Sequence, residues 1–313
     1  MPIAAKTSPR RPGRGPAPRA GTRPKIEAPW RLQRVGGLEI LELAAFRALG
    51  WLVHGFSTRT GGASVPAPGE RVCNLGFTEW DLRESVMKNR QMFQSALGAG
   101  DHTLLPLSQF HSSVVHFFAA APSHPLKGDA ALTGVAGLLL AVQTADCVPI
   151  LLVDPKRRAI AAVHAGWRGT LARITEKTVG EMRQRLRSNP ADLLAAIGPS
   201  IGSCCYEVGT ELVAQFASQF ADAGDWFDEL RTGDEPNPLQ WLNRMPPGHQ
   251  PPPKKVRLDL PRANRAQLLA AGLAGKNIFR SGLCTACHPD LFFSYRKEGH
   301  QSGRLLSVVG IRP

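Results

Sequence analysis

The chain has 313 residues, 43% of them hydrophobic, and its 38 basic against 25 acidic residues give a formal net charge of +13. This length accommodates a substantial core in one large domain or two small ones. No apolar run reaches the roughly 18 to 20 residues of a membrane span, and no apolar core of a signal peptide stands near the start. We therefore expect a cytoplasmic protein without a membrane-spanning segment.

Most of the surplus charge lies at the start of the chain. Nine basic residues stand within residues 1–34 against one acidic residue, Glu27, which leaves a charge of only about +5 for the rest. Because the first residues are rich in Pro, Gly and Arg and poor in apolar side chains, residues 1–30 are predicted to form a disordered basic tail. The mild surplus elsewhere disfavours a nucleic-acid partner.

The elements up to residue 97 are predicted with uneven clarity. Residues 38–49 mix helical and strand spacing, and the pattern leaves both open. Residues 53–59 predict a short strand that runs into a turn at Gly61 and Gly62. Residues 82–97 repeat apolar side chains at helical spacing, which predicts a helix.

Strands and helices alternate in the rest of the chain without a strict βαβ rhythm. The predicted strands are 137–143, 148–153, 159–164, 193–197, 291–295 and 305–311. The predicted helices are 171–186, 212–220 and 258–271. Residues 225–255, rich in Pro, Gly, Asn and charge, are predicted to be a surface loop insertion. The whole predicts an α+β or mixed-sheet domain over residues 31–313.

Polar residues stand at the ends of buried strands. Asp146 and Cys147 interrupt an apolar run, and His164 ends the strand that follows it along the chain. Burying a carboxylate or an imidazole is costly unless the group is paired or binds a metal. Thiolate and imidazole are preferred zinc ligands, and three protein ligands with one open position are typical of a catalytic site.

Cys147 and His164 can meet, because the two strands that carry them are predicted to be neighbours. The third ligand is left open among four histidines, of which His111 is favoured because it follows a loop and precedes a strand. The four are His54, His111, His116 and His124. Two other interpretations stay open: a core cysteine beside a hydrogen-bonded histidine, and a metal-free Cys–His nucleophile as in thiol hydrolases.

The other cysteines are predicted to serve packing. The chain is too long to need disulfides and lacks a secretion signal, which favours a reducing compartment. Cys284 and Cys287 have the spacing of half a structural zinc site, but the adjacent Cys204 and Cys205 suit shared tetrahedral ligation poorly. We therefore expect these four thiols to pack near a pocket wall.

Three arginines stand at predicted junctions between strands and loops, beside Gly, Ser or aromatic residues: Arg59, Arg168 and Arg296. A guanidinium group there suits a phosphate or a carboxylate, to which it donates two parallel hydrogen bonds. The alternative for each arginine is a surface salt bridge.

Many phrases of the sequence, in order along the chain, resemble the YfiH family, also called the laccase-domain, polyphenol oxidase or purine nucleoside phosphorylase family. The phrases are HGFSTRTGG (54–62), NLG (74–76), NR (89–90), QFH (109–111), TADCVP (144–149), AVHAGWRG (162–169), AIGPSIG (196–202), CYEVG (205–209), LDL (258–260), CTAC (284–287), FFSYR (292–296) and GR (303–304). They extend from His54 to the C-terminal region. The chain departs from the family in having Ser112 where a glycine is usual, and in the length of the 225–255 insertion.

The resemblance implies a single domain with α/β/β/α layering, related to bacterial toxin deamidases that use a Cys/His pair. It also implies a zinc site formed by His111, Cys147 and His164. The implied reactions are phosphorolysis of adenosine, inosine, guanosine and S-methyl-5′-thioadenosine, together with deamination of adenosine. The expected partners are therefore purine nucleosides and phosphate, and we expect a monomer.

A copper-dependent polyphenol oxidase, or laccase, is the alternative enzyme class. The three-copper cluster of a true multicopper enzyme rests on His-x-His pairs, and no two of the nine histidines have that spacing. A set of two histidines and one cysteine could still bind copper by the affinity order of divalent metals.

Overall fold

The computed structural model of the protein describes residues 24–230 and 255–313. Most of the predicted tail over residues 1–30, and most of the predicted insertion over 225–255, lie outside these residues. Among the described residues, no helix is long and apolar enough to cross a membrane.

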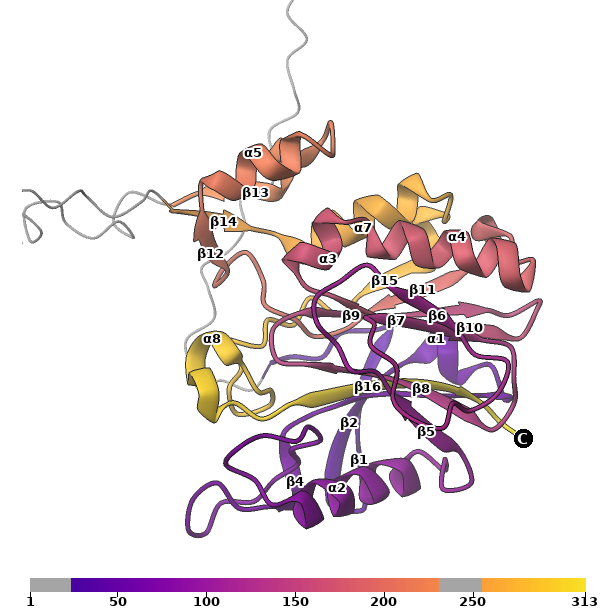
Figure 1. The fold of residues 1–313 in the computed structure, drawn as a ribbon. Coiled ribbons are helices and arrows are strands. Elements are labelled where there is room, and N and C mark those ends of the chain that lie inside the picture. Colours follow the sequence, from indigo (N-terminus) through magenta and orange to yellow (C-terminus); the bar gives the residue numbers. More distant parts are fainter. Residues whose placement is uncertain (1–23, 231–254) are drawn as a thin grey trace, which may run out of the picture.

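Two six-stranded sheets are stacked face to face, and helices cover their outer faces, so the predicted α/β/β/α layering is confirmed (Figure 1). The first sheet has the order β1 (Trp30–Val35), β2 (Leu38–Leu43), β3 (Leu52–Ser57), β16 (Leu305–Ile311), β8 (Leu138–Thr144) and β5 (Thr103–Pro106). The second has the order β15 (Ile278–Arg280), β11 (Leu194–Ile197), β9 (Val148–Asp154), β10 (Ala159–Ala165), β7 (Ala130–Thr133) and β6 (Val115–Phe117).

A small third sheet and the helices complete the fold. The third sheet has the order β12 (Glu207–Gly209), β14 (Lys255–Leu258) and β13 (Phe227–Glu229), and β4 is Thr60–Ser64. The α-helices are α1 (Ala44–Arg47), α2 (Arg83–Ala96), α3 (Trp167–Leu171), α4 (Ile174–Leu186), α5 (Glu211–Ala217), α7 (Leu260–Ala270) and α8 (Tyr295–Glu298). The 3₁₀ helices are η1 (Pro190–Asp192), η2 (Ala223–Trp226), η3 (Gly275–Asn277) and η4 (Gly299–Gln301). Helix α2 covers the first sheet, and α4 and α7 cover the second (Figure 1).

The core explains why the central strands are continuously apolar. Along β9, Val148, Ile150 and Leu152 pack toward the helices, whereas Leu151 and Val153 belong to the cluster between the two sheets. Side chains alternate between the two faces of a strand, and here both faces are covered. A strand buried on both faces has no polar side to show, which is why 148–153 and 159–164 could be recognised from composition alone.

The chain passes between the two sheets at two places that matter for function. Strands β8 and β9 follow each other in sequence but belong to different sheets, so residues 145–147 form a crossover. Strands β5 and β6 do the same, and residues 107–114 form the second crossover. Both crossovers carry residues that the sequence singled out.

Some predicted elements differ from the structure. Residues 291–295 are not a strand: Leu291 and Phe292 are buried in a turn, and α8 starts at Tyr295, so burial rather than strand pairing explains the apolar run. Gly61 and Gly62 lie inside β4 and have positive φ of 78° and 90°.

Two segments with helical spacing each contain parts of two separate elements. The ambiguous segment 38–49 holds strand β2 followed by the short helix α1. The predicted helix 171–186 begins only at Ile174, because Arg173 adopts a left-handed conformation (φ 60°) that separates α3 from α4.

Candidate metal centre

His111, Cys147 and His164 lie together in the structure. Each offers one ligand atom, and these atoms all lie within 4.8 Å of one another. The Sγ atom of Cys147 is 3.7 Å from Nε2 of His111, and the two imidazole rings are 5.0 Å apart between centroids. His164 is buried, Cys147 is half-buried and His111 is exposed, so the group opens to the surface on the side of His111.

The register of two strands brings Cys147 to His164. Strands β9 and β10 are antiparallel, and Val148 pairs with Ala165 while Pro149 pairs with His164. Cys147 directly precedes this ladder and therefore stands beside the end of β10. The expected proximity of the two strands is thus confirmed.

The donor set and its spacing fit a zinc ion. With a zinc–sulfur distance of about 2.3 Å and a zinc–nitrogen distance of about 2.0 Å, a tetrahedral angle places sulfur and nitrogen roughly 3.5 Å apart. The observed separation of 3.7 Å between Cys147 Sγ and His111 Nε2 is close to that value. Three protein donors leave the fourth position of a tetrahedral ion for a ligand.

Asp129, which the sequence analysis did not single out, organises the two histidines. Its buried carboxylate accepts a hydrogen bond from Nδ1 of His164 at 2.8 Å and from the backbone N–H of His111 at 3.0 Å. It also accepts from the backbone N–H and the hydroxyl of Ser112, both at 2.6 Å. Because Nδ1 donates to the carboxylate, Nε2 is the ring nitrogen of His164 that remains for a metal ion. Carboxylates beside metal-binding histidines fix tautomer and ring orientation in this way.

The loop that carries His111 is held in a conformation uncommon for a residue with a side chain. The φ of His111 is 62°, in the left-handed region, where non-glycine residues store strain on the order of 1–3 kcal/mol. The bonds from the N–H groups of His111 and Ser112 to Asp129 offset that strain. Asp129 therefore positions both the side chain of His164 and the backbone of His111.

Asp146 fixes the crossover between β8 and β9 in the same manner. It also has a positive φ, of 91°. Its carboxylate accepts from the hydroxyl of Thr285 and from the backbone N–H of Arg296, each at 2.6 Å, and its carbonyl accepts from the N–H of Ile201 at 2.9 Å. Burial raises the pKa of Asp146. These bonds connect the loop before Cys147 to two segments distant in sequence.

The charges of the site favour a thiolate at Cys147. Burial opposes ionisation of the thiol, but the positive charge of His164 and the hydrogen bond to His111 outweigh it, and the pKa of Cys147 falls to about 6. Burial also opposes protonation of His164, but the thiolate and Asp129 raise its pKa to about 9. Despite burial, the bonds from His164 and Ser112 lower the pKa of Asp129 to about 2.

We expect the metal-free protein to be alkylated by iodoacetamide at Cys147 with a rate that is half-maximal near pH 6, because the thiolate is the nucleophile and the pKa of this thiol is depressed. Peptide-level mass spectrometry over a pH series measures it, and Cys147→Ser supplies the blank. A rate that rises only near pH 8.5, the value of a free cysteine, would contradict the arrangement.

A glycine leaves room for the three donors. A Cβ atom placed on Gly166 would lie 2.8 Å from Cδ2 of His111 and 3.1 Å from Sγ of Cys147. Because the backbone φ of Gly166 is −74°, alanine can adopt the conformation and the clash is confined to the site.

Gly166→Ala is expected to lower zinc affinity by about 10- to 100-fold, the range seen when groups around metal ligands are disturbed. Competition with a chelating dye measures the affinity. The matched control is Gly180→Ala in α4, where an added Cβ meets nothing within 4 Å. If the two variants had equal zinc affinities, Gly166 would not lie at the edge of a metal site.

The structure separates the three predicted arginines. Arg59 donates to Glu298 at 2.6 Å and to the carbonyl of Pro289 at 2.8 Å, and its guanidinium lies over the ring of Phe293. Arg59 thus makes the salt bridge that was its alternative, and any phosphate would have to share its guanidinium with these partners.

Arg168 and Arg296 are exposed, and both act electrostatically on Tyr206. Arg296 stacks on Tyr206 with 5.2 Å between the guanidinium carbon and the ring centroid. Burial raises the pKa of Tyr206 to about 12, the charge of Cys147 acts in the same direction, and Arg296 and Arg168 act against it. Both arginines and Cys147 thus act electrostatically on the same tyrosine.

Arg304 is a further arginine of this neighbourhood. Burial lowers its pKa, and the negative charges of Cys147 and Asp146 act in the opposite direction. Its only signal in the sequence was its place in a motif next to Gly303, because the electrostatic interaction with Cys147 joins residues more than 150 positions apart.

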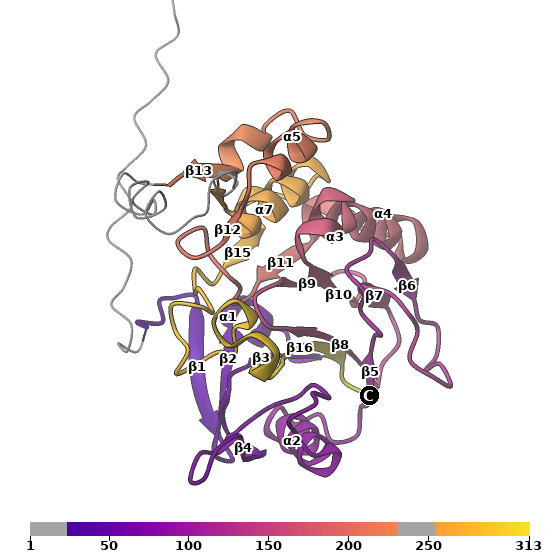
Figure 2. The ribbon, with the colours of Figure 1, turned by 60° about the vertical axis from the view of Figure 1, so that its left-hand side comes forward.

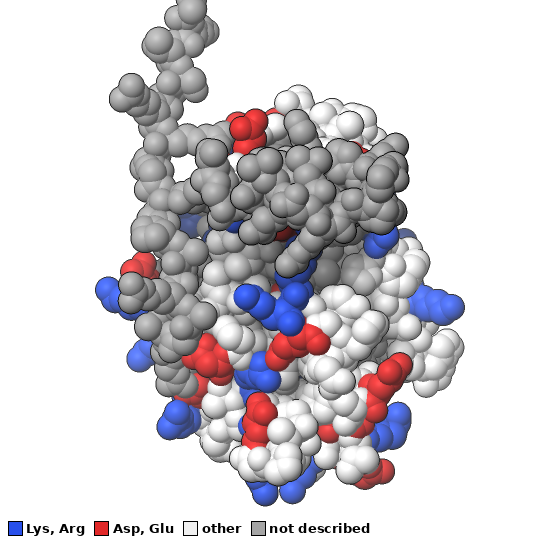
Figure 3. Space-filling view, turned by 90° about the vertical axis from the view of Figure 1, so that its left-hand side faces the viewer, with Lys and Arg blue, Asp and Glu red and all other residues white. Residues whose placement is uncertain are grey.

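The surface around this region mixes both signs of charge. Figure 1 places α8, which holds Arg296, at one end of the two stacked sheets, and in Figure 2, where that side comes forward, the yellow helix lies in front of them. On the face that looks out from that end, basic and acidic side chains alternate among the described residues (Figure 3). This alternation suits a small polar ligand better than the uniform basic surface of a nucleic-acid partner.

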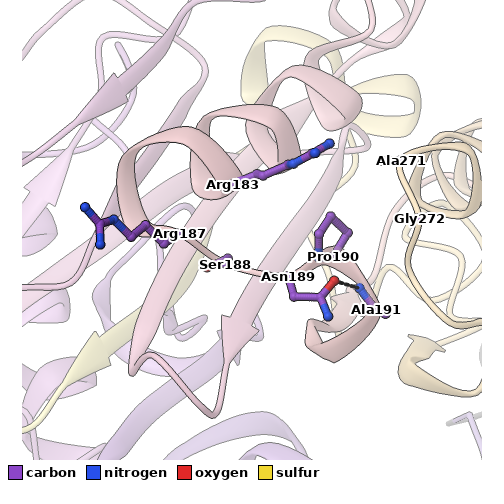
Figure 4. A pocket seen from close by; sticks show the side chains of 8 residues that line it. All are labelled: Arg183, Arg187, Ser188, Asn189, Pro190, Ala191, Ala271 and Gly272. Atoms are coloured by element: carbon purple, nitrogen blue, oxygen red, sulfur yellow. Dashed lines mark hydrogen bonds between the residues drawn. The ribbon is translucent and has the colours of Figure 1, made fainter.

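A pocket away from the candidate metal centre contains none of the predicted site residues. It has a volume of about 560 Å³ at the C-terminal end of α4, where Asn189 accepts from the N–H of Ala191 (Figure 4). Its lining residues are Arg183, Arg187, Ser188, Asn189, Pro190, Ala191, Ala271 and Gly272.

Comparison with known proteins points to one family. Residues 53–312 match the family model described as multi-copper polyphenol oxidoreductase laccase. Over 260 residues the chain is 39% identical to the purine nucleoside phosphorylase of Deinococcus radiodurans, which covers 82% of this chain and 88% of that protein. Over 181 residues it is 39% identical to adenosine deaminase RL5 of an unknown prokaryotic organism, which covers 58% of this chain and 61% of that protein.

The fold has solved counterparts. The structure of the hypothetical protein YfiH from Bacillus licheniformis superposes with a TM-score of 0.76 and 28% sequence identity, over 91% of this chain and all of that one.

Proposed function

The chain belongs to the family described as multi-copper polyphenol oxidoreductase laccase, and on that premise we propose that it is a zinc-dependent purine nucleoside phosphorylase with adenosine deaminase activity. Its substrates would be adenosine, inosine, guanosine or S-methyl-5′-thioadenosine together with phosphate, and the products the free base and the pentose 1-phosphate. Residues 31–313 would form the catalytic domain.

The observation that carries the proposal is the convergence of His111, Cys147 and His164 within 4.8 Å, with an open side at the exposed His111. The name of the Deinococcus radiodurans relative supports phosphorolysis, and that of the partial relative supports deamination. Since one chain supplies all three donors, no second copy is needed to complete the site, which supports a monomer.

Some residues of the site would hold the ion, and others would hold the substrate. The three donors would hold zinc, a Lewis acid that at such an open position lowers the pKa of water toward neutrality, as in zinc deaminases. Through its bond to Nδ1, Asp129 would keep the proton on that nitrogen of His164, so that Nε2 could bind the ion in place of its own proton. Arg168 and Arg296, exposed and close to Tyr206, would bind phosphate by charge-assisted hydrogen bonds, and Arg59 could join them from its contact with Glu298.

The experiment that tests the proposal is incubation of the zinc-loaded protein with adenosine, with and without phosphate, followed by chromatography of adenine, inosine and hypoxanthine. Adenine is expected only with phosphate, and inosine in both cases. Arg168→Ala is expected to raise the KM for phosphate, with Arg183→Ala, an arginine of the pocket in Figure 4, as the matched control. Absence of all three products from metal-loaded protein would refute the proposal.

A metal-free thiol hydrolase is the second candidate, and one observation favours it. Cys147, His164 and Asp129 stand in the order nucleophile, base and orienting carboxylate. Chelation separates the two: it would abolish phosphorolysis by a zinc enzyme and leave a thiol hydrolase active.

A copper-dependent polyphenol oxidase is the reaction named in the family description. Copper binds most sites more tightly than zinc does, so the three donors could accept it. Metal analysis of protein purified without added copper, followed by a phenol oxidation assay, would separate oxidase from phosphorylase.

A further inference from the structure

Four cysteines outside the candidate metal centre form a second cluster. They come from two segments, residues 200–206 and 283–288, that an isolated parallel bridge between Ser200 and Cys284 holds side by side. The Sγ atoms of Cys204, Cys205, Cys284 and Cys287 all lie within 4.8 Å of one another. Sγ of Cys287 is 3.4 Å from the sulfur of Cys204 and 3.4 Å from that of Cys205, and all four are free cysteines.

This spacing matches a tetrahedron of thiolates. With a zinc–sulfur distance of about 2.3 Å, tetrahedrally arranged sulfurs lie about 3.8 Å apart. Side chains that merely fill a core have no reason to bring four sulfurs into mutual contact, whereas a shared ion does.

The turn around Gly202 explains how two adjacent cysteines reach the same point. The N–H groups of Cys205 and Tyr206 both donate to the carbonyl of Gly202, at 2.9 and 3.0 Å. This tight turn carries Cys204 and Cys205 to one side, facing the other pair. Because of this turn, Cys204 and Cys205 can reach one point together, contrary to the expectation that their adjacency disfavours shared ligation.

The backbone at Gly202 also accommodates and hydrogen-bonds the sulfur atoms. The N–H of Gly202 donates to Sγ of Cys284 at 3.3 Å, a bond that stabilises a negative sulfur. A Cβ on Gly202 would lie 3.2 Å from Sγ of Cys204, so the absence of a side chain permits this approach. Ile201 and Ala286 cover the cluster with apolar surface.

We propose that Cys204, Cys205, Cys284 and Cys287 bind a second zinc ion in a closed structural site. Four protein ligands leave no position for a substrate, which distinguishes this site from the three-donor centre. The proposal concerns an additional ion and is independent of the reaction proposed above.

The second site would fix one wall of the first. Ile201 and Thr285, from the two cysteine-bearing segments, both donate to Asp146, the residue before Cys147. Tyr206, directly after Cys205, feels the charge of Cys147 and carries Arg296 on its ring. An ion joining the two segments would hold these contacts in place without touching substrate.

Metal counting tests the proposal. The wild-type protein, dialysed against metal-free buffer, is expected to retain two zinc ions per chain. Cys147→Ser and the double variant Cys284→Ser/Cys287→Ser are each expected to retain one. The control is Cys73→Ala, which removes the one cysteine outside both clusters and should leave two. One ion in the wild type, retained in the double variant, would overturn the proposal.

Cobalt substitution covers the case in which the double variant does not fold. Sulfur-to-cobalt charge transfer grows with the number of thiolate ligands, so Cys147→Ser loaded with one cobalt should keep most of the wild-type absorption. Loss of most of that absorption in Cys147→Ser would contradict a four-thiolate site. Neither measurement uses nucleosides, so failure of the proposed reaction would leave the result unaffected.

Discussion

Cys147→Ser is expected to lose its zinc ion at the three-donor centre and to lower kcat/KM for phosphorolysis of adenosine by more than about 100-fold. Changes to groups around metal ligands already cost about 10- to 100-fold in affinity or activity, and Cys147 is placed to be a ligand itself. A serine hydroxyl is the nearest isostere, but it does not ionise near neutral pH, so the negative ligand is lost while the volume is nearly retained.

The measurement pairs steady-state kinetics with metal analysis of the same sample. Cys73→Ala controls for removal of a buried thiol, because Cys73 lies in the cluster under α2, away from the site. Retention of full activity by a Cys147→Ser variant that has lost its zinc would separate the reaction from the metal and refute the role given to Cys147.

Asp129→Asn is expected to weaken zinc binding by about 10- to 100-fold and to destabilise the fold by about 2–3 kcal/mol. The carboxylate of Asp129 accepts from His164, from the N–H of His111 and from two groups of Ser112. An amide has only one acceptor oxygen, so its NH₂ group would face donors, and each unsatisfied buried donor costs about 1–3 kcal/mol.

The pH dependence of stability checks this assignment in the metal-free protein. Because the pKa of Asp129 is lowered to about 2 in the folded state, against about 3.9 in an unfolded chain, its ionised form stabilises the fold fully above about pH 4. That contribution disappears as the pH falls through about 2. The stability gap between wild type and Asp129→Asn, from urea unfolding, should narrow over this window, and a constant gap would contradict the role of the charge.

A matched variant tests whether Asp129 acts through the loop backbone around His111 or through the ring of His164. Ser112→Ala removes one of the donors to Asp129, the hydroxyl, and leaves the bond from His164 intact. It is expected to lower stability modestly, by about 1 kcal/mol, with zinc affinity nearly unchanged. If Ser112→Ala lost as much zinc affinity as Asp129→Asn, the ordering of the loop that carries His111, and not the bond to His164, would account for the effect of Asp129.

The sequence was sufficient for the parts of the site that rest on local patterns. The strands β9 and β10 follow from their apolar runs, and Cys147 and His164 follow from polar residues at the ends of those runs. The family resemblance supplied His111 as the third donor. The layering followed from the same resemblance and not from periodicity.

What the sequence could not supply depends on contacts between distant residues. Asp129 stands before a short buried strand like many other acidic residues, and its role arises from partners 18 and 35 positions away. The cysteine cluster joins residues 82 and 83 positions apart, through a turn that no local rule predicted. Arg59 was predicted to bind phosphate because its actual partner, Glu298, is distant in sequence and could not be recognised from the local pattern.

The two crossovers between the sheets have a mechanical consequence. His111 lies on the segment that leaves β5 for β6, and Cys147 on the one that leaves β8 for β9, so both donors stand where the layers are joined. An ion bound there would cross-link the two halves of the sandwich rather than a single loop. Its removal should therefore speed amide exchange in strands on both sides of the seam, and sliding of one layer over the other would change the coordination shell directly.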